Sequence, residues 1–304
     1  MIPDFQTIML PFMQHIADGE EHSTTETHDF LAQKFNLSEN ELNQYLPSGN
    51  QKTFYNRVFW AKAHLKMAGL IDNIKRGHFI ITNRGKQALS QKPNAINIKF
   101  LKQFPEYLEN SRKNRADEKI NVVETENDIE SNATPEEILE SNYLKVRNNL
   151  ASEILSKIKS SPPAFFENLV VELLVKMGYG GTIHDAGKSI GRSGDEGIDG
   201  IIKEDRLGLD IIYIQAKRWE NIVGRPEIQK FVGALAGQGA KKGVFITTSR
   251  FSNEAKEYQP KNETKIVLID GEQLADLMID FDLAVTTTHT YQIKRIDNDY
   301  FFEE

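Results

Sequence analysis

The sequence contains no cysteine among its 304 residues, which excludes disulfide bonds and thiolate metal sites. Its seven histidines are scattered without the spacing of metal ligands, so we expect no structural zinc site. No apolar run approaches the roughly 20 residues that a membrane-spanning helix needs. The first residues lack the basic segment and the small-residue cleavage site of a signal peptide. We therefore expect a cytoplasmic protein that makes no contact with a membrane.

The chain also lacks an overall positive charge, because its formal net charge is −7. The acidity is concentrated in residues 106–140, which carry 11 acidic and 4 basic side chains. Residues 51–86 show the opposite balance, with eight basic residues and a single acid, Asp72. The local cluster of charge, and not the sum, decides whether a protein binds nucleic acid. Nucleic-acid binding therefore stays open, with residues 51–86 as its candidate region.

Residues 1–105 have the pattern of a small helical domain. Apolar residues recur at helical spacing in three segments, most clearly from Phe54 to Ala68. Gly69 follows this third segment, at the place where a glycine commonly ends a helix. Two short β-prone runs then flank a turn at Arg76-Gly77. Three helices followed by a hairpin predict a mainly α winged helix-turn-helix domain.

The third helix and the hairpin of this block carry the positive charge. A solvated helix face is the usual reason for surface charge, but charge of one sign on the expected recognition helix and wing favours contact with DNA phosphates. A modified base that is flipped out of the duplex would need an aromatic pocket, for which Tyr55 and Trp60 are candidates, although such residues more often belong to a core. The candidate DNA-binding residues are Lys52, Arg57, Lys62, Lys66, Lys75 and Arg76.

Residues 106–133 are polar, acidic and nearly without large apolar side chains, so we expect an acidic flexible linker. The linker ends at Thr134-Pro135-Glu136-Glu137, which has the pattern of a helix start. From residue 134 to residue 304, helical segments alternate with β-prone runs. This alternation predicts an α/β domain.

Three polar residues of the α/β block have the spacing of a catalytic site. Gln215 and Lys217 are two apart on an expected strand, so both side chains point to the same face. Asp199 begins the preceding strand, and a hairpin between the two strands would bring it beside them. An Asp in a glycine-rich turn is often only a turn residue, but the three together favour a functional site.

These residue types suit the hydrolysis of phosphodiester bonds. Asp199 and the Gln215 carbonyl oxygen are hard ligands for Mg²⁺, with Mn²⁺ as an expected substitute. Lys217 would orient or deprotonate the attacking water and stabilise the developing charge. Glu167, on the preceding helix, would add a carboxylate to the metal, although helix glutamates are usually solvated. Thr247, Thr248 and Ser249 end a strand and are candidates for phosphate contacts.

The order of motifs resembles the Mrr branch of the PD-(D/E)xK nucleases. The resemblance covers nearly all of residues 160–285, and residues 1–105 resemble the Mrr N-terminal winged helix. It is carried by Phe166-Glu167, Gly178-Tyr179, the run from Gly194 to Gly200, Gln215-Ala216-Lys217, the segment from Val223 to Gln229 and the segment from Gly243 to Ser249.

The resemblance implies catalytic roles for Asp199, Gln215, Lys217 and Glu167, and an α/β nuclease domain of the restriction-endonuclease type over 134–304. Ile198 and Gln215 depart from the parent superfamily, which has Pro and an acidic residue there, but both match the Mrr branch. Because Gln215 is neutral where the parent superfamily has an acidic residue, the metal would have one negatively charged ligand fewer. Asp195 and Gln229 are further candidates, as residues that would contact the metal ligands without binding the metal. The alternative is that both are solvated surface residues.

We therefore expect a Mg²⁺-dependent endonuclease, a type IV restriction enzyme that cuts methylated foreign DNA. Cleavage of a duplex needs two active sites, so we expect a homodimer or a larger symmetric homo-oligomer. The alternatives are a non-catalytic DNA-binding regulator with a relic nuclease fold, and a nuclease that recognises DNA structure instead of modification. The intact set of Asp199, Gln215 and Lys217 speaks against the regulator. Fold does not separate the two nucleases.

Overall fold

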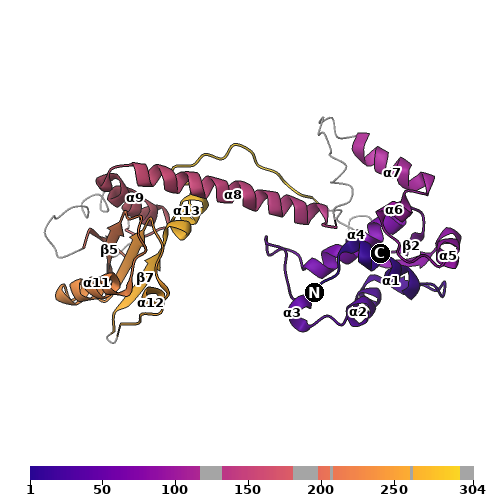
Figure 1. The fold of residues 1–304 in the computed structure, drawn as a ribbon, viewed down its shortest axis with the longest axis horizontal. Helices are drawn as coiled ribbons and strands as arrows, with labels where there is room; N and C mark the ends of the chain where they lie inside the picture. Colours follow the sequence, from indigo (N-terminus) through magenta and orange to yellow (C-terminus); the bar gives the residue numbers. More distant parts are fainter. Residues whose placement is uncertain (117–131, 181–197, 206–207, 261–262, 295–304) are drawn as a thin grey trace. The chain divides into compact units, whose positions relative to one another are not determined.

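The chain forms two compact units, the first made mainly of Met1–Leu144 and the second of Lys145–Ile293 (Figure 1). The structure is a computed structural model that describes residues 1–116, 132–180, 198–205, 208–260 and 263–294. Among these residues, none of the helices combines the length and the apolar character that crossing a bilayer requires.

The first unit combines helices with a small antiparallel sheet of strand order β1-β3-β2. Four helices, α1 to α4, precede a two-stranded hairpin, and a short strand follows the first helix. The helices α1, α2 and α4 correspond to the three helical segments that the sequence predicts, and the hairpin corresponds to the predicted wing. In chain order, the elements are α1 (Phe5–His15), β1 (His22–Ser23), α2 (Thr24–Lys34), α3 (Glu39–Leu42), α4 (Thr53–Met67), β2 (Ile71–Lys75), β3 (His78–Ile81), α5 (Asn83–Ser90), α6 (Ile98–Leu101) and α7 (Pro105–Ala116).

Two glycines fix the shape of the wing. Gly69 has a φ of 67° and ends α4, so the chain turns directly from the third helix into β2. Gly77 has a φ of 71° and forms the turn between β2 and β3. Both positions match the sequence prediction, because only a residue without a Cβ adopts this conformation readily.

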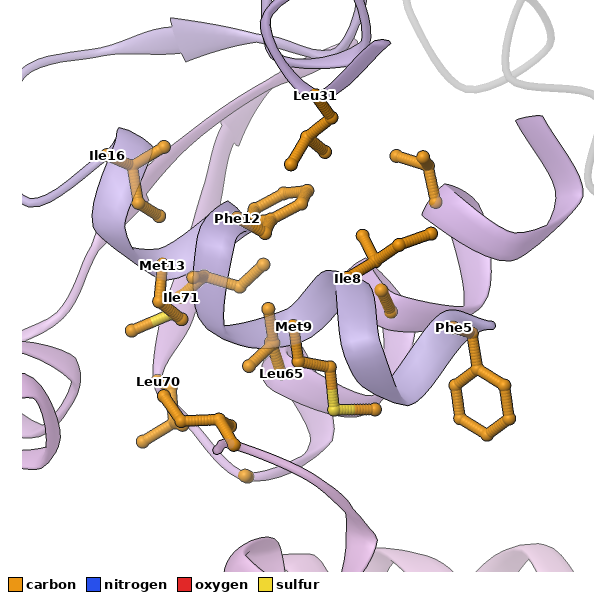
Figure 2. Close-up of a cluster of buried hydrophobic side chains, with 14 of the residues drawn as sticks. Phe5, Ile8, Met9, Phe12, Met13, Ile16, Leu31, Leu65, Leu70 and Ile71 are labelled. Carbon is orange, nitrogen blue, oxygen red and sulfur yellow. The ribbon is translucent and has the colours of Figure 1, made fainter. Parts of the chain in front are cut away.

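The core of the first unit is built on α1, whose apolar residues recur every three or four positions (Figure 2). Phe12 is 1% exposed and stacks on Phe79 of the wing, with ring centroids 5.2 Å apart. Burying a side chain of this size stabilises the fold by about 1.5–3 kcal/mol. Figure 2 shows the α1 side chains Phe5, Ile8, Met9, Phe12, Met13 and Ile16 beside Leu31, Leu65, Leu70 and Ile71.

The predicted linker at 106–133 is wrong at its start, because residues 105–116 form the helix α7. Tyr107 is 4% exposed within the first core, and its hydroxyl lies 2.8 Å from Nδ1 of His64. The Asn110 side chain donates to the Met67 carbonyl oxygen, and Glu106 pairs with Arg84. One buried aromatic ring and these polar contacts hold a segment whose composition alone indicates a linker.

The predicted boundary at residue 134 also moves, because α8 (Pro135–Ser160) begins in the first unit. Thr134 and Glu137 form the expected capping box, with Thr134 N donating to Glu137 Oε2 at 2.8 Å. The first turns of the helix are fixed by Glu136 to Trp60, Glu137 to Arg57 and Glu140 to Ser48. The boundary between the units therefore falls inside α8.

The second unit is an α/β domain around a four-stranded sheet of order β4-β5-β6-β7. The β4–β5 pair is antiparallel and the other two pairs are parallel. Its further elements are α9 (Pro163–Lys176), β4 (Gly200–Lys203), β5 (Ile211–Lys217), α11 (Arg225–Gly237), β6 (Lys242–Thr247), α12 (Asn253–Lys256), β7 (Lys265–Ile269) and α13 (Gly271–Asp280).

Helices cover both faces of this sheet, so each face has its own core. Ile214 and Ala216 belong to the core that includes α8, α9 and α13. Tyr213 and Phe245 pack in the second core, which includes α11 and α12. Successive residues of β5 therefore alternate between the two cores, and the odd-numbered ones share the α11 face.

Candidate functional site

The β4–β5 hairpin positions Asp199 at the end of a strand pair. Gly200, the first residue of β4, pairs with Ile214, and Asp199 comes directly before it in the chain. Its backbone N–H donates to the Ile214 carbonyl oxygen at 2.9 Å, and its Oδ2 accepts from Ala216 N at 2.8 Å. The carboxylate thus takes the place of a backbone carbonyl and is held against the end of β5.

Lys217 lies beside this carboxylate, with Nζ 3.8 Å from Asp199 Oδ2. The two side chains are 26% and 21% exposed, so the pair is accessible from solvent. The structure therefore brings Asp199 and Lys217 together in the way that the predicted hairpin requires.

Gln215 lies two residues before Lys217 on the same face of β5, and it is 6% exposed. Its neighbours Ile214 and Ala216 point into the opposite core. A strand whose interior is otherwise apolar thus ends in a polar face that carries Gln215 and Lys217, next to Asp199.

Glu167 lies on α9 and is half-buried beside the fully buried Phe166. The helix packs in the core that contains Ile214 and Ala216, whereas Gln215 and Lys217 lie on the other face of β5. The metal-binding role of Glu167 stays a prediction. Asp195 lies outside the described residues, and Gln229 is an exposed residue of α11.

The phosphate contacts predicted for Thr247, Thr248 and Ser249 are wrong, because these hydroxyls are buried and used internally. Thr247 Oγ1 donates to the Lys217 carbonyl oxygen at 2.8 Å, and Thr248 Oγ1 donates to that of Trp219 at 2.8 Å. Ser249 Oγ donates to the Glu220 carbonyl oxygen at 3.0 Å. The three residues brace the chain that leaves β5, and Thr247 holds the backbone of Lys217.

A second candidate site is the exposed face of α4. Tyr55, Phe59 and Lys66 are exposed and recur at helical spacing, with the half-buried Lys62 between them. Nζ of Lys62 lies 4.2 Å from the centroid of the Phe79 ring. Burial lowers the pKa of Lys62 to about 8, with the nearby charge of Lys66 acting in the same direction. This face combines aromatic and basic side chains on α4, the helix that directly precedes the β2–β3 hairpin.

The wing adds cationic residues next to this helix. Arg76 is exposed at the turn between β2 and β3, beside Gly77. Lys75 is 58% exposed and pairs with Glu21 at 2.5 Å. Lys52, just before α4, donates to the Asn43 side chain at 2.8 Å. These residues remain at the surface, although Lys52 and Lys75 already have polar partners.

Arg57 has internal partners, and its predicted contact with DNA stays a prediction. Its side chain is 21% exposed and pairs with Glu137 at 2.8 Å. It also donates to the backbone carbonyl oxygens of Ile2 and Pro3 at 2.8 and 3.1 Å. A guanidinium with its donors satisfied in this way ties α4 to the N-terminus and to α8.

The aromatic candidates for a base pocket differ in their surroundings. Trp60 is half-buried, and its Nε1 donates to Glu136 at 2.6 Å, so it belongs to the internal contacts of α8. Tyr55 is 47% exposed and stacks on His28, with ring centroids 3.6 Å apart. Only Tyr55 offers an open aromatic surface of the two.

Comparisons with known proteins match both parts of the chain. Residues 158–278 match the family model described as a restriction endonuclease of the Mrr catalytic type, and residues 5–91 match the Mrr N-terminal domain. EcoKMrr, a type IV methyl-directed restriction enzyme of Escherichia coli (strain K12), is 33% identical over 305 residues, which cover 99% of this chain and 99% of that protein.

A solved structure of the MspJI restriction endonuclease in complex with a 27-mer oligonucleotide is 23% identical, with a TM-score of 0.33. The matched region covers 43% of this chain and 31% of the MspJI chain. At this TM-score, the likeness supports no conclusion about the fold or function of this chain. The full-length relative and the two matched domains agree with each other. The chain belongs to the Mrr family of restriction endonucleases, and it is an enzyme of that type.

Proposed function

We propose that this chain is a Mg²⁺-dependent type IV restriction endonuclease, which hydrolyses the backbone of DNA that carries methylated bases. The observation that carries the proposal is the Asp199–Lys217 pair, 3.8 Å apart at the end of the β4–β5 hairpin and open to solvent. A partly exposed ion pair with its charged atoms 3.8 Å apart stabilises a fold by little, about 0–1 kcal/mol, so stability does not explain its position.

The donor atoms at this place fit a hard divalent cation. Asp199 Oδ2 is held by Ala216 N, which orients the carboxylate, and Gln215 supplies an amide oxygen on the same face. Asp199 and Gln215 would hold the ion, and Glu167 would complete its ligands. When bound, the ion neutralises the scissile phosphate and makes the attacking water more acidic. Restriction endonucleases generally use a divalent metal, and Mg²⁺, with Mn²⁺ as a substitute, is the choice that these oxygen ligands favour.

Lys217 contributes a positive charge at a fixed place. Its backbone carbonyl is held by Thr247, and its Nζ lies against the Asp199 carboxylate. An ammonium held there orients the attacking water and offsets the negative charge that develops on the phosphate oxygens. Because both partners are fixed before DNA binds, little reorganisation accompanies the reaction.

Double-stranded DNA is the proposed partner of the first unit. The exposed side chains Tyr55, Phe59 and Lys66 on α4, together with Arg76 on the wing, support this assignment. Methylation as the recognised feature comes from the name of the Escherichia coli relative, which is methyl-directed. Tyr55 is the aromatic residue of α4 best placed to contact an exposed base.

We also propose that two copies of the chain pair through α8. The exposed apolar residues Leu139, Tyr143, Val146 and Leu150 follow steps of four, three and four, which is the period of a coiled coil. A stripe of this kind is unusual on a surface that faces water. A second copy of α8 would cover it and would supply the second active site that duplex cleavage needs.

The test of the proposed function is plasmid cleavage with Mg²⁺. Matched plasmids, methylated and unmethylated, are incubated with the wild-type chain and with Asp199→Asn. We expect cleavage of the methylated plasmid alone, lost in the variant. Equal cleavage of both plasmids would show that the enzyme does not recognise DNA methylation, and that it recognises DNA sequence or structure instead. Cleavage that persists in Asp199→Asn would overturn the site.

A further inference from the structure

Folding brings two histidines and two acidic residues of the segment 15–26 together in the first unit. His15 ends α1, His22 lies on β1, and Glu26 lies in the first turn of α2. Asp18 lies in the turn between His15 and His22. None of these residues belongs to the nuclease unit or to the exposed face of α4.

The donor atoms of three of these side chains converge on one point. One ligand atom each of His15, His22 and Glu26 lies within 4.8 Å of the others. His22 Nδ1 is 3.3 Å and His15 Nε2 is 3.8 Å from the same carboxylate oxygen, Glu26 Oε1. Ligand atoms of a tetrahedral zinc ion lie about 3.3 Å apart, given bonds of about 2.0–2.1 Å. Glu26 is 55% exposed, so its side chain can rotate to close the remaining gap.

His15 contributes a nitrogen that lacks a hydrogen bond. Its Nε2 is buried and has no hydrogen-bond partner among the described residues. The ring is fixed by stacking on Phe30, with centroids 4.0 Å apart and an interplanar angle of 14°. A buried polar atom without a partner destabilises the folded state, so its retention calls for an explanation. Burial, followed by the neighbouring His22, lowers the pKa of His15, which leaves this ring neutral and able to bind a cation.

His22 lies between two carboxylates. Its Nε2 is 2.9 Å from Asp18 Oδ1, and its Nδ1 is 3.3 Å from Glu26 Oε1. A neutral ring has one N–H for these two acceptors. If Nε2 donates to Asp18, the lone pair of Nδ1 faces Glu26, and a proton or a metal ion must separate them. A histidine whose outer nitrogen donates to a carboxylate is the usual arrangement behind a metal ligand.

We propose that His15, His22 and Glu26 bind Zn²⁺, with Asp18 orienting the His22 ring. Two imidazole nitrogens and one carboxylate select zinc over Mg²⁺, which prefers oxygen ligands. The site ties the end of α1 to β1 and α2. Because β1 pairs with β3 through His22 and Phe79, the ion braces the wing against the helices. This role is independent of the nuclease site in the second unit.

The test is a Zn²⁺ titration of the full chain after chelator treatment, followed by competition with a chromophoric chelator. The Asp199→Asn background weakens the competing nuclease site. We expect one tightly bound equivalent in that background. The affinity should fall at least tenfold in His15→Gln and in Glu26→Gln, and it should be unchanged in the control His289→Gln, which alters an exposed histidine.

Circular dichroism of the metal-free variants separates lost binding from lost folding, and the exposed Glu26 makes Glu26→Gln the variant least able to disturb the core. Co²⁺ supplies an independent readout, because its visible absorption reports ligand geometry and should change in Glu26→Gln. The proposal is overturned if the folded chain binds no stoichiometric Zn²⁺. It is also overturned if folded His15→Gln and Glu26→Gln bind as tightly as the control, since a proton on His22 would then explain the cluster.

Discussion

At the scale of single residues, the arrangement of the proposed catalytic set follows from strand geometry. The alternation of side chains along a strand predicts that Gln215 and Lys217 share a face, and the hairpin register brings Asp199 to Lys217. The Asp199 carboxylate also accepts a hydrogen bond from Ala216 N, in the place of a backbone carbonyl oxygen. The sequence does not show this bond, because it depends on where the backbone pairing of β4 and β5 ends.

Other residue roles depend on partners far away in the sequence. Arg57 looks like a DNA contact because its charge is visible, but its partner Glu137 is 80 residues on. Thr247 looks like a phosphate contact because strand ends border sites, but its hydroxyl braces Lys217. His15 and His22 show no ligand spacing, and only the turn after α1 brings them together. In each case, tertiary structure decides how the polar group is satisfied.

His64 gives a pH prediction for the first unit. Burial lowers its pKa from 6.5 to about 4, and the ring stacks on Phe5 next to the Tyr107 hydroxyl. Below pH 6.5 the unfolded chain binds a proton that the folded chain does not, so stability falls as the pH falls towards 4. The expected loss between pH 7 and pH 5 is about 2 kcal/mol.

Chemical denaturation at the two pH values measures this loss, with Trp60 fluorescence as the probe in a Trp219→Phe background. His64→Gln keeps a polar partner for Tyr107 but cannot titrate, so its loss should be smaller by about 2 kcal/mol. The other buried histidines contribute equally to the pH dependence of stability in the wild type and in the variant. An identical loss in both would show that His64 is already protonated or exposed in the folded state.

At the scale of elements, most helices and strands could be predicted because their patterns are local. The sequence predicts strands at 200–202, 211–216, 243–247 and 265–269 and a helix at 54–68. All five lie within one or two residues of β4, β5, β6, β7 and α4. The helix α7 was missed because its composition is polar and a single residue, Tyr107, supplies much of its buried surface. Composition describes the average of a segment, whereas one buried aromatic ring can hold the whole segment in a packed helix.

The exposed face of α4 predicts how salt affects DNA binding. Lys66 is exposed on this face, so Lys66→Ala should weaken binding to all duplex sequences by a similar factor. The slope of log affinity against log salt concentration should fall by about one. Fluorescence anisotropy over a salt series measures both quantities.

The matched control is Lys99→Ala, which removes the same charge from the exposed surface of α6. Its affinity and slope should match the wild type. If the two variants behave alike, DNA binding responds to the total charge of the unit, and α4 is not the recognition helix.

The start of α8 could be predicted from Thr134 to Glu137, but the exposure of its apolar stripe could not, because periodicity does not say what covers a helix face. If a second copy covers it, the wild-type chain sediments as a dimer and Tyr143→Glu as a monomer. Burying a charge in a coiled-coil seam is strongly unfavourable. Ser141→Glu, on the opposite side of the helix, should remain a dimer. A wild-type monomer, or a dimeric Tyr143→Glu, would contradict pairing through α8.

At the scale of the whole molecule, the net charge of −7 is a poor guide to function. The acidity is concentrated around residues 106–140, and the first turns of α8 use part of it in contacts with Arg57, Trp60 and Ser48. Exposed basic residues remain on α4 and the wing, among them Lys66 and Arg76. A chain with a negative sum can therefore present a local cationic face to DNA.

The two-unit organisation could be predicted from composition, but the boundary between the units could not. A change from polar to periodic sequence marks the start of α8, and the division of the chain falls ten residues later, inside the helix. A helix start is a local signal, whereas a domain boundary depends on which core each turn contacts.

The most direct test of the central claim compares Lys217→Ala with Lys203→Ala, an exposed lysine of the same hairpin. Single-turnover cleavage of methylated DNA and the affinity for that DNA are measured for both variants with Mg²⁺. Lys217→Ala should lower the cleavage rate by about 10²–10⁴-fold. Its affinity for DNA, and both quantities in Lys203→Ala, should stay within about twofold of the wild type. Wild-type cleavage by a folded, DNA-bound Lys217→Ala would show that the Asp199–Lys217 pair is not the site of hydrolysis.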